Sequence, residues 1–208
     1  MKVTTKAGVV ATLILASGLA QADWSVNLGY ASEYYYRGIF QKNSSANGGI
    51  NFEAGGFYAG TWAADVGDGL EVDGFFGYGM DLGEIGLSAG YTGYFYTGDF
   101  DDTYQEINLG GSFGIASLDV AVGQYENFEG PTLDYTYYAL TLEQNGLYGK
   151  YAGFSQDFDG SYLELGYGAT VADIDFGIVL IINDEDLNGT DGNDENVIFT
   201  VGKTFDLQ

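Results

Sequence analysis

The chain has 208 residues, with 30 acidic and 6 basic side chains, a formal net charge of −24, 34 glycines, one proline and neither histidine nor cysteine. Without His or Cys there can be no disulfide, thiolate catalyst, histidine base or ordinary zinc or haem site. The charge excludes nucleic-acid binding through phosphate contacts, which requires Lys and Arg. The apolar content of 46% and the aromatic content of 16% exclude a disordered acidic tail and favour β structure.

The first 22 residues have the pattern of a secretory signal peptide. Two lysines precede an apolar and small-residue run at 7–20, and Ala20-Gln21-Ala22 fits the small-x-small cleavage rule. The run is shorter than the roughly 20 residues that a transmembrane helix needs. We therefore expect a signal peptide at 1–22 and a mature domain at 23–208 with a net charge of −26, since the removed segment holds two lysines and no acid.

The segment 24–37 alternates with a period of two. Its aromatic face carries Trp24, Val26, Leu28, Tyr30, Ser32, Tyr34 and Tyr36, and its small or polar face carries Ser25, Asn27, Gly29, Ala31, Glu33, Tyr35 and Arg37. This alternation predicts a β-strand with one face against an apolar medium. The same period recurs at 72–80, 85–91, 106–113, 163–169, 173–182 and 197–202.

The connections between these segments alternate between long and short. We expect long acidic or polar connections near 38–48, 66–71, 97–103, 125–132, 155–161 and 183–195, and short ones near 55–56, 81–84, 116–117, 144–146 and 171–172. Outer-membrane barrels have long external loops and short periplasmic turns, which produces this alternation.

The spacing of these segments predicts twelve strands. If each membrane-crossing strand takes about 10 residues, twelve strands leave connections of about six residues. Eight strands would leave connections far longer than the spacing shows, and sixteen would leave almost none; ten or fourteen are the nearest alternatives. The expected fold is an all-β, antiparallel, up-and-down transmembrane β-barrel of about 12 strands, with both termini at the periplasmic rim because the strand number is even.

A soluble β-sandwich is the competing fold. Its apolar faces would be buried in a shared core and its outer faces would be charged. Here the second face is rich in Gly, Ala and Ser, which suit strands that curve around a narrow interior. The apolar face is rich in aromatic residues, as lipid interfaces require. Together with the signal peptide, these features favour a barrel in the cell outer membrane over a soluble periplasmic or secreted β module.

Carboxylates dominate the face assigned to the barrel interior. The candidate pore-lining residues are Glu33, Arg37, Glu53, Asp73, Glu106, Asp119, Glu164 and Asp175, with Lys150 as a further basic candidate. Uncompensated carboxylates in a narrow tube attract cations, which predicts a cation-favouring channel. The alternative is a hydrogen-bonded plug of these acids with Arg37, which would bind an acid of a neighbouring strand such as Glu53. The intermediate bore of a twelve-stranded barrel is compatible with both.

The segment 184–195, DEDLNGTDGNDE, fits the spacing D-x-[DN]-x-[DN]-G-x5-E of a calcium-binding loop. The candidate ligands are Asp184, Asp186, Asn188, the Thr190 carbonyl and Glu195. No helical pattern flanks the segment, and Asp191 stands where an apolar residue normally packs. A solvated external loop is therefore the alternative, and no cofactor other than calcium is a candidate.

The segment Ser32–Gln41, SEYYYRGIFQ, resembles the S-x-Y-x-x-R-G-x-x-Q signature that opens the proteobacterial Gcw_chp group, the TorF family of porins. The similarity continues at 56–66, 73–78, 90–98 and 162–178, and so extends over essentially the whole mature chain. The resemblance implies an outer-membrane barrel of the porin type whose solute is not established. The chain differs in having Thr97 where the family usually has Pro, and in ending on Leu207-Gln208 rather than on the terminal aromatic of barrel-assembly signals.

These features predict an outer-membrane channel for passive diffusion of small solutes. The alternative is a structural or adhesive barrel without a conducting pore, whose acidic external loops bind divalent cations. We expect no enzymatic activity, because no His can activate a Ser nucleophile and carboxylate pairs are uninformative in so acidic a chain. The expected partners are outer-membrane lipid, lipopolysaccharide and the barrel-assembly machinery, with no nucleic acid; the sequence carries no signal for an oligomeric state.

Overall fold

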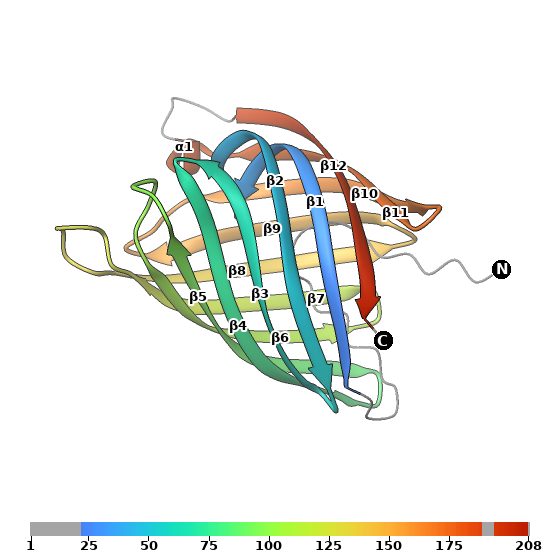
Figure 1. The fold of residues 1–208 in the computed structure, drawn as a ribbon. Coiled ribbons are helices and arrows are strands. Elements are labelled where there is room, and N and C mark those ends of the chain that lie inside the picture. Colours follow the sequence, from blue (N-terminus) through green and yellow to red (C-terminus); the bar gives the residue numbers. More distant parts are fainter. Residues whose placement is uncertain (1–21, 189–193, 208) are drawn as a thin grey trace.

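The computed structural model describes residues 22–188 and 194–207, which form a closed antiparallel barrel of twelve strands in chain order (Figure 1). The strands are β1 (Asp23–Tyr36), β2 (Ile39–Ala54), β3 (Phe57–Gly67), β4 (Gly69–Leu82), β5 (Ile85–Tyr96), β6 (Tyr104–Phe113), β7 (Ala116–Tyr125), β8 (Leu133–Gln144), β9 (Leu147–Gln156), β10 (Ser161–Val171), β11 (Ile174–Asn183) and β12 (Asp194–Leu207), and the short helix α1 (Glu185–Asn188) precedes β12. The predicted fold and strand number are confirmed. The expected signal peptide lies outside the described residues, apart from Ala22. In the described part of the chain, no helix has the length and apolar character to cross a membrane.

The two rims of the barrel differ in the length of their connections. One rim, here the short-turn rim, has two-residue turns at 55–56, 83–84, 114–115, 145–146 and 172–173, whereas the opposite loop rim has its longer connections at 97–103, 126–132, 157–160 and 184–193. Asn145 and Gly146 both have positive φ, the geometry that two-residue hairpins favour. The termini meet at the short-turn rim, where Trp24 pairs with Leu207.

Two of the predicted long connections are wrong. The stretch 38–48 lies almost entirely in β2, and β4 already begins at Gly69. Both stretches are rich in polar residues and Gly, a composition that the loops and the strands of this barrel share, so composition alone does not separate the two.

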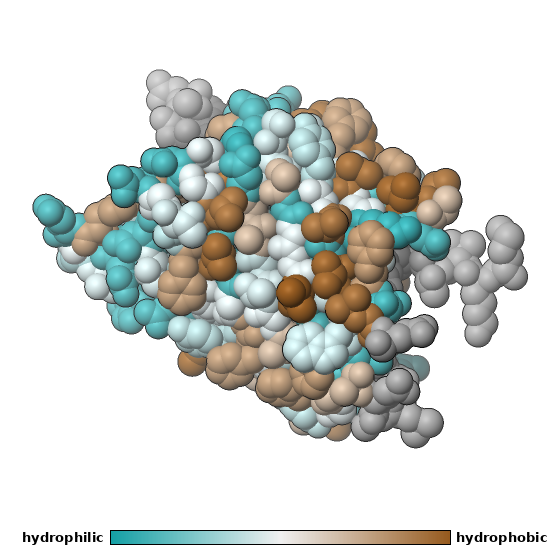
Figure 2. Space-filling view, in the orientation of Figure 1, coloured by the Kyte–Doolittle hydropathy of each residue, from teal (hydrophilic) through white to brown (hydrophobic). Residues whose placement is uncertain are grey.

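Alternate side chains point outward and inward along the wall. The outward set is apolar and exposed, and includes Phe76, Tyr78, Met80, Ile107, Leu109, Leu163, Leu165, Tyr167, Phe176 and Ile178. Figure 2 shows apolar side chains over the strands and hydrophilic ones gathered at the loop rim. An apolar outer band around a polar interior is the surface of a transmembrane barrel.

An arginine on the outer face should destabilise the barrel far more than one on the inner face. Leu109, at the middle of β6, is 53% exposed on the outside, whereas the Asn108 amide reaches Thr92 inside. We expect Leu109→Arg to lower the unfolding free energy by about 2–4 kcal/mol, measured by urea unfolding in lipid vesicles. Asn108→Arg is the matched control, and equal losses in both variants would contradict the assignment of faces.

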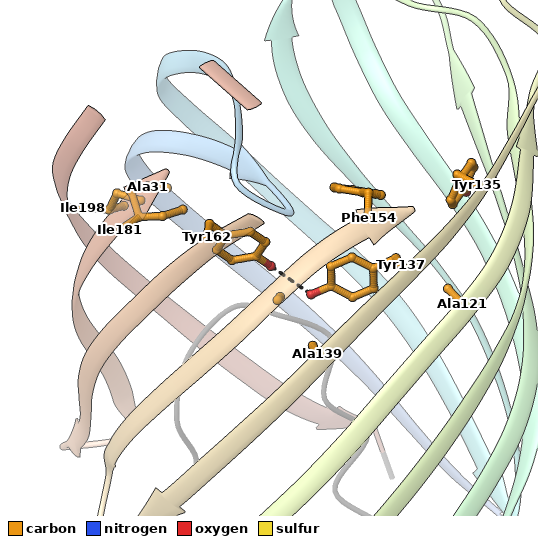
Figure 3. Close-up of a cluster of buried hydrophobic side chains, with 10 residues drawn as sticks. Ala31, Ala121, Tyr135, Tyr137, Ala139, Phe154, Tyr162, Ile181 and Ile198 are labelled. Carbon is orange, nitrogen blue, oxygen red and sulfur yellow. Dashed lines mark hydrogen bonds between the residues drawn. The ribbon is translucent and has the colours of Figure 1, made fainter. Parts of the chain in front are cut away.

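The interior is packed with large side chains near the loop rim. Tyr135, Tyr137, Phe154, Tyr162, Ile181 and Ile198 form a buried cluster (Figure 3). In Figure 3 Tyr137 of β8 and Tyr162 of β10 point toward each other, and their hydroxyls lie 2.8 Å apart. The barrel is therefore filled at this level.

Candidate functional site in the barrel lumen

The tip of the β1–β2 hairpin leaves the barrel wall. Among the described residues, β1 pairs with β12 from Trp24 to Ala31, and β2 pairs with β3 from Asn47 to Ala54. The two strands nevertheless stay paired with each other as far as Tyr36 and Ile39. Residues 32–46, the inserted hairpin, therefore have no ladder partner in the described part of the wall, and they bend over the interior (Figures 1 and 3).

A tight turn at Arg37-Gly38 ends the inserted hairpin. Both residues have positive φ, 49° and 88°. A Cβ on Gly38 would lie 2.7 Å from the Tyr162 ring, so only glycine allows this approach to the wall. The Asn183 amide donates a hydrogen bond to the Gly38 carbonyl at 2.5 Å. The turn is thus held against β10 and β11, inside the barrel.

Arg37 reaches across the lumen to a carboxylate on β6. Its two terminal nitrogens donate to the two oxygens of Glu106, each at 2.7 Å. The hydroxyls of Tyr94 and Tyr135 donate to the same carboxylate at 2.8 and 2.9 Å. The guanidinium carbon lies 4.1 Å from the centre of the Tyr137 ring. We call these five residues the Arg37 cluster; its bidentate geometry and cation–π contact are strong interactions for a guanidinium.

Two further carboxylates on β4 lie beside this cluster. Glu71 is 1% exposed and accepts hydrogen bonds from Tyr34 at 2.7 Å and Tyr96 at 3.3 Å. Asp73 is 9% exposed, and its Oδ1 has no hydrogen-bond partner among the described residues. The buried centre of the lumen therefore holds three carboxylates and one guanidinium.

A second ion pair lies below the Arg37 cluster. Lys150 donates to Glu164 at 2.8 Å, and the Tyr148 hydroxyl donates to the same carboxylate at 3.3 Å. Asp119 lies on the inner face, close to Gly110, and is exposed. Water therefore reaches the lumen at the level of Asp119.

A cavity of about 50 Å³ separates the inserted hairpin from the wall. Tyr36, Ile39 and Gln41 of the hairpin line it, together with Tyr96, Asp101, Tyr104, Tyr135, Phe154 and Phe158. Such a volume holds a few water molecules. The cavity beside the hairpin is therefore water-sized.

The structure brings some of the predicted lining residues together and separates others. Arg37, Asp73 and Glu106 meet at the centre, and Asp119 and Glu164 lie on the inner face below them. Glu33 is half-buried on the inserted hairpin, and Asp175 is half-buried and bound by Thr170 at 2.5 Å. Glu53 is exposed at the short-turn rim, where it pairs with Asp23.

Arg37 pairs with an acid, as the plug alternative expects, but the acid is not Glu53. Glu53 lies at the opposite end of β2, and the partner is Glu106, 69 residues away along the chain. The outward assignment of Tyr34 and Tyr36 is also wrong: Tyr34 binds Glu71, and Tyr36 packs on Tyr94. Tyr34 and Tyr36 are covered by protein because the hairpin has left the wall, whereas Phe40 of the same hairpin is 47% exposed.

Glu71 and the tyrosines of the centre were not predicted as site residues. Glu71 falls in a stretch expected to be a loop. The tyrosines do carry a signal, since they occur as Tyr-x-Tyr pairs at 34/36, 94/96 and 135/137. Residues two apart share a strand face, and each pair faces the interior rather than lipid.

The predicted calcium ligands are only partly described. Asp184 accepts hydrogen bonds from the Ser161 N–H and hydroxyl at 2.6 and 2.9 Å. Glu195 lies in β12, paired with Ile182, and Thr190 lies outside the described residues. Within residues 22–188 and 194–207 no three acidic side chains are grouped closely enough to hold a metal ion.

Comparison with known proteins supports the barrel fold but assigns the chain to no family. No family model and no curated protein matches the chain, so the TorF resemblance stays a prediction. A solved structure from work on in-meso crystallization of membrane proteins matches with a TM-score of 0.57 at 10% identity, over 89% of this chain and 84% of that one. OccK2 (OpdF) of Pseudomonas aeruginosa, in complex with glucuronate, has a TM-score of 0.43 at 14% identity over 89% of this chain. OccAB3 of Acinetobacter baumannii has a TM-score of 0.44 at 12% identity over 86%. This chain spans 62% and 60% of those two proteins.

Proposed function

We propose that the protein is an outer-membrane channel for passive diffusion of small cationic solutes, closed in this conformation by the inserted hairpin. The observation that carries the proposal is the charge of the lumen. Among the described residues, the inward carboxylates include Glu71, Asp73, Glu106, Asp119 and Glu164, and the basic side chains beside them are Arg37 and Lys150. Fixed carboxylates inside low-dielectric walls lower the energy of a passing cation and raise that of an anion.

The shape of the lumen supports a gated path. Water reaches Asp119 from below, and small residues such as Gly90 and Gly110 line the neighbouring wall. At the level of the inserted hairpin, Tyr36, Arg37 and Gly38 lie in the lumen against β5, β6 and β10. Passage therefore requires the hairpin to move, and the closed protein should conduct little.

Planar-bilayer recording in a potassium chloride gradient tests the proposal. We expect rare openings whose reversal potential favours potassium. Asp119→Asn removes a lumen charge exposed to water and should lower the cation-to-anion permeability ratio severalfold. Glu129→Gln, in the external connection 126–132, is the matched control and should leave the ratio unchanged. A chloride preference of the unaltered protein would refute cation selectivity, and its failure to conduct under any voltage would refute the channel.

The second candidate is a structural barrel whose external loops bind divalent cations. One observation favours it: desolvation, together with the negative charges of Asp159, Asp184 and Glu185, raises the pKa of the Asp186 carboxyl. A cation bound near Asp186 would relieve this repulsion, although within residues 22–188 and 194–207 no three acidic side chains already stand in a metal-binding arrangement.

Calcium titration of the whole purified protein tests this second candidate. We expect the parent protein to bind calcium with measurable heat. In Asp186→Asn the calcium affinity should fall at least about tenfold, because carboxylates are the preferred calcium ligands. Asp206→Asn, at the short-turn rim, should bind like the parent. Equal calcium affinity in all three proteins, or no binding heat at all, would refute calcium binding by this loop.

A further inference from the structure

We infer that Arg37 occupies a binding site for guanidinium-bearing solutes and acts there as a tethered competitor. The inference deepens the proposed function by naming a solute class. The site lies within the proposed path, at the level of the inserted hairpin.

The wall supplies the whole receptor half of this site. Glu106 comes from β6, Tyr94 from β5, and Tyr135 and Tyr137 from β8. These side chains fix a carboxylate fork and an aromatic face, and the inserted hairpin contributes the guanidinium alone. A planar cation with paired N–H donors fits such a fork far better than a point charge does.

The negative charge around the site favours binding of a free cation, either beside the Arg37 guanidinium or in its place. Asp73 lies within Coulombic range of Glu71, Glu106 and Arg37. Its buried Oδ1, on the wall strand β4, has no hydrogen-bond partner among the described residues. A buried acceptor without a donor is unfavourable, so a free solute with N–H groups gains contacts that the tethered Arg37 does not satisfy.

The hairpin that carries Arg37 is held by side-chain contacts and by no backbone ladder to the described wall residues. Tyr34 binds Glu71, Lys42 binds Asp65, and the Gly38 carbonyl accepts from Asn183. Below the hairpin, the pairing of β1 with β12 from Trp24 to Ala31 closes the barrel independently. The hairpin can therefore leave the site without opening the wall.

Removal of the tethered guanidinium tests the site directly. In Arg37→Ala, methylguanidinium at millimolar concentration should raise the midpoint of thermal unfolding above that in sodium chloride of equal ionic strength. The parent should show no such shift because Arg37 fills the site. Arg37→Ala combined with Glu106→Gln should lose the response, with affinity falling at least about tenfold. No shift in Arg37→Ala, or equal shifts with and without Glu106, would overturn the inference.

A second readout separates this inference from the proposed function. Methylguanidinium should block the current through Arg37→Ala and not through the double variant. Stabilisation without any conductance would support the binding site and refute the channel. Cation-selective current without stabilisation or block would support the channel and refute the binding site. If Arg37→Ala fails to fold, Arg37→Lys replaces it: its ammonium cannot make the bidentate contact, so methylguanidinium should still stabilise it, and absence of that effect would count against the site.

Discussion

Replacing residues 34–42 with an Asn-Gly turn is expected to raise the single-channel conductance severalfold. The change removes Tyr34, Tyr36, Arg37 and Gly38 from the lumen, and it joins Glu33 to Asn43, which already face each other in the β1–β2 ladder. An Asn-Gly pair suits a two-residue hairpin. Because the ladder from Trp24 to Ala31 is untouched, the barrel should remain closed along its wall. Conductance would be measured in planar bilayers.

The matched control shortens a connection that does not enter the lumen. Replacing 127–131, between β7 and β8, with an Asn-Gly turn should leave the conductance at the parent level. If the shortened β1–β2 hairpin conducted no better than this control, the inserted hairpin would not be the barrier, and the Lys150–Glu164 level would have to be the narrow point instead.

Glu106→Ala is expected to lower the unfolding free energy by about 3–5 kcal/mol, because it leaves the buried Arg37 guanidinium without its counter-charge. Tyr94 and Tyr135 lose their acceptor in the same step. The double replacement Arg37→Met with Glu106→Leu should recover most of the loss, since exchanging a whole buried ion pair for apolar side chains is often neutral or stabilising. Urea unfolding in lipid vesicles would measure both.

The ion pair between Lys42 of the inserted hairpin and Asp65 of β3 provides the control. Lys42 and Asp65 have side chains that are 26% and 39% exposed, so water screens their attraction. Asp65→Asn should therefore leave the urea midpoint close to that of the parent protein. Equal losses in Glu106→Ala and Asp65→Asn would show that the central ion pair is not effectively desolvated.

The barrel itself could be predicted because its signals are local. The period-two faces of segments such as 163–169 depend only on adjacent residues, and turn signals such as Asn145-Gly146 mark where a strand ends. Twelve strands then follow from the length of chain that a membrane-crossing strand consumes. These predictions needed no knowledge of which strands meet.

The inserted hairpin could not be predicted from such local signals. Residues 32–36 alternate in the same way as a wall strand, and nothing within the segment shows that it detaches. Its position depends on Glu106 and Asn183, which are 69 and 145 residues distant in sequence from the groups they bind. Burial of Tyr34 and Tyr36 is a consequence of that long-range contact, which is why a rule based on alternation assigned them to lipid.

The point at which the hairpin leaves the wall also limits how deeply the barrel can sit in the membrane. Beyond Ala31–Thr200 and Asn47–Ala64, the facing edges of β12 and β3 have no ladder partner among the described residues, and the Phe199 N–H is satisfied by the Ser32 hydroxyl instead. Peptide groups without partners are not tolerated in hydrocarbon. The acyl-chain region must therefore end at or below these pairs, and the wall above them stands among hydrated headgroups.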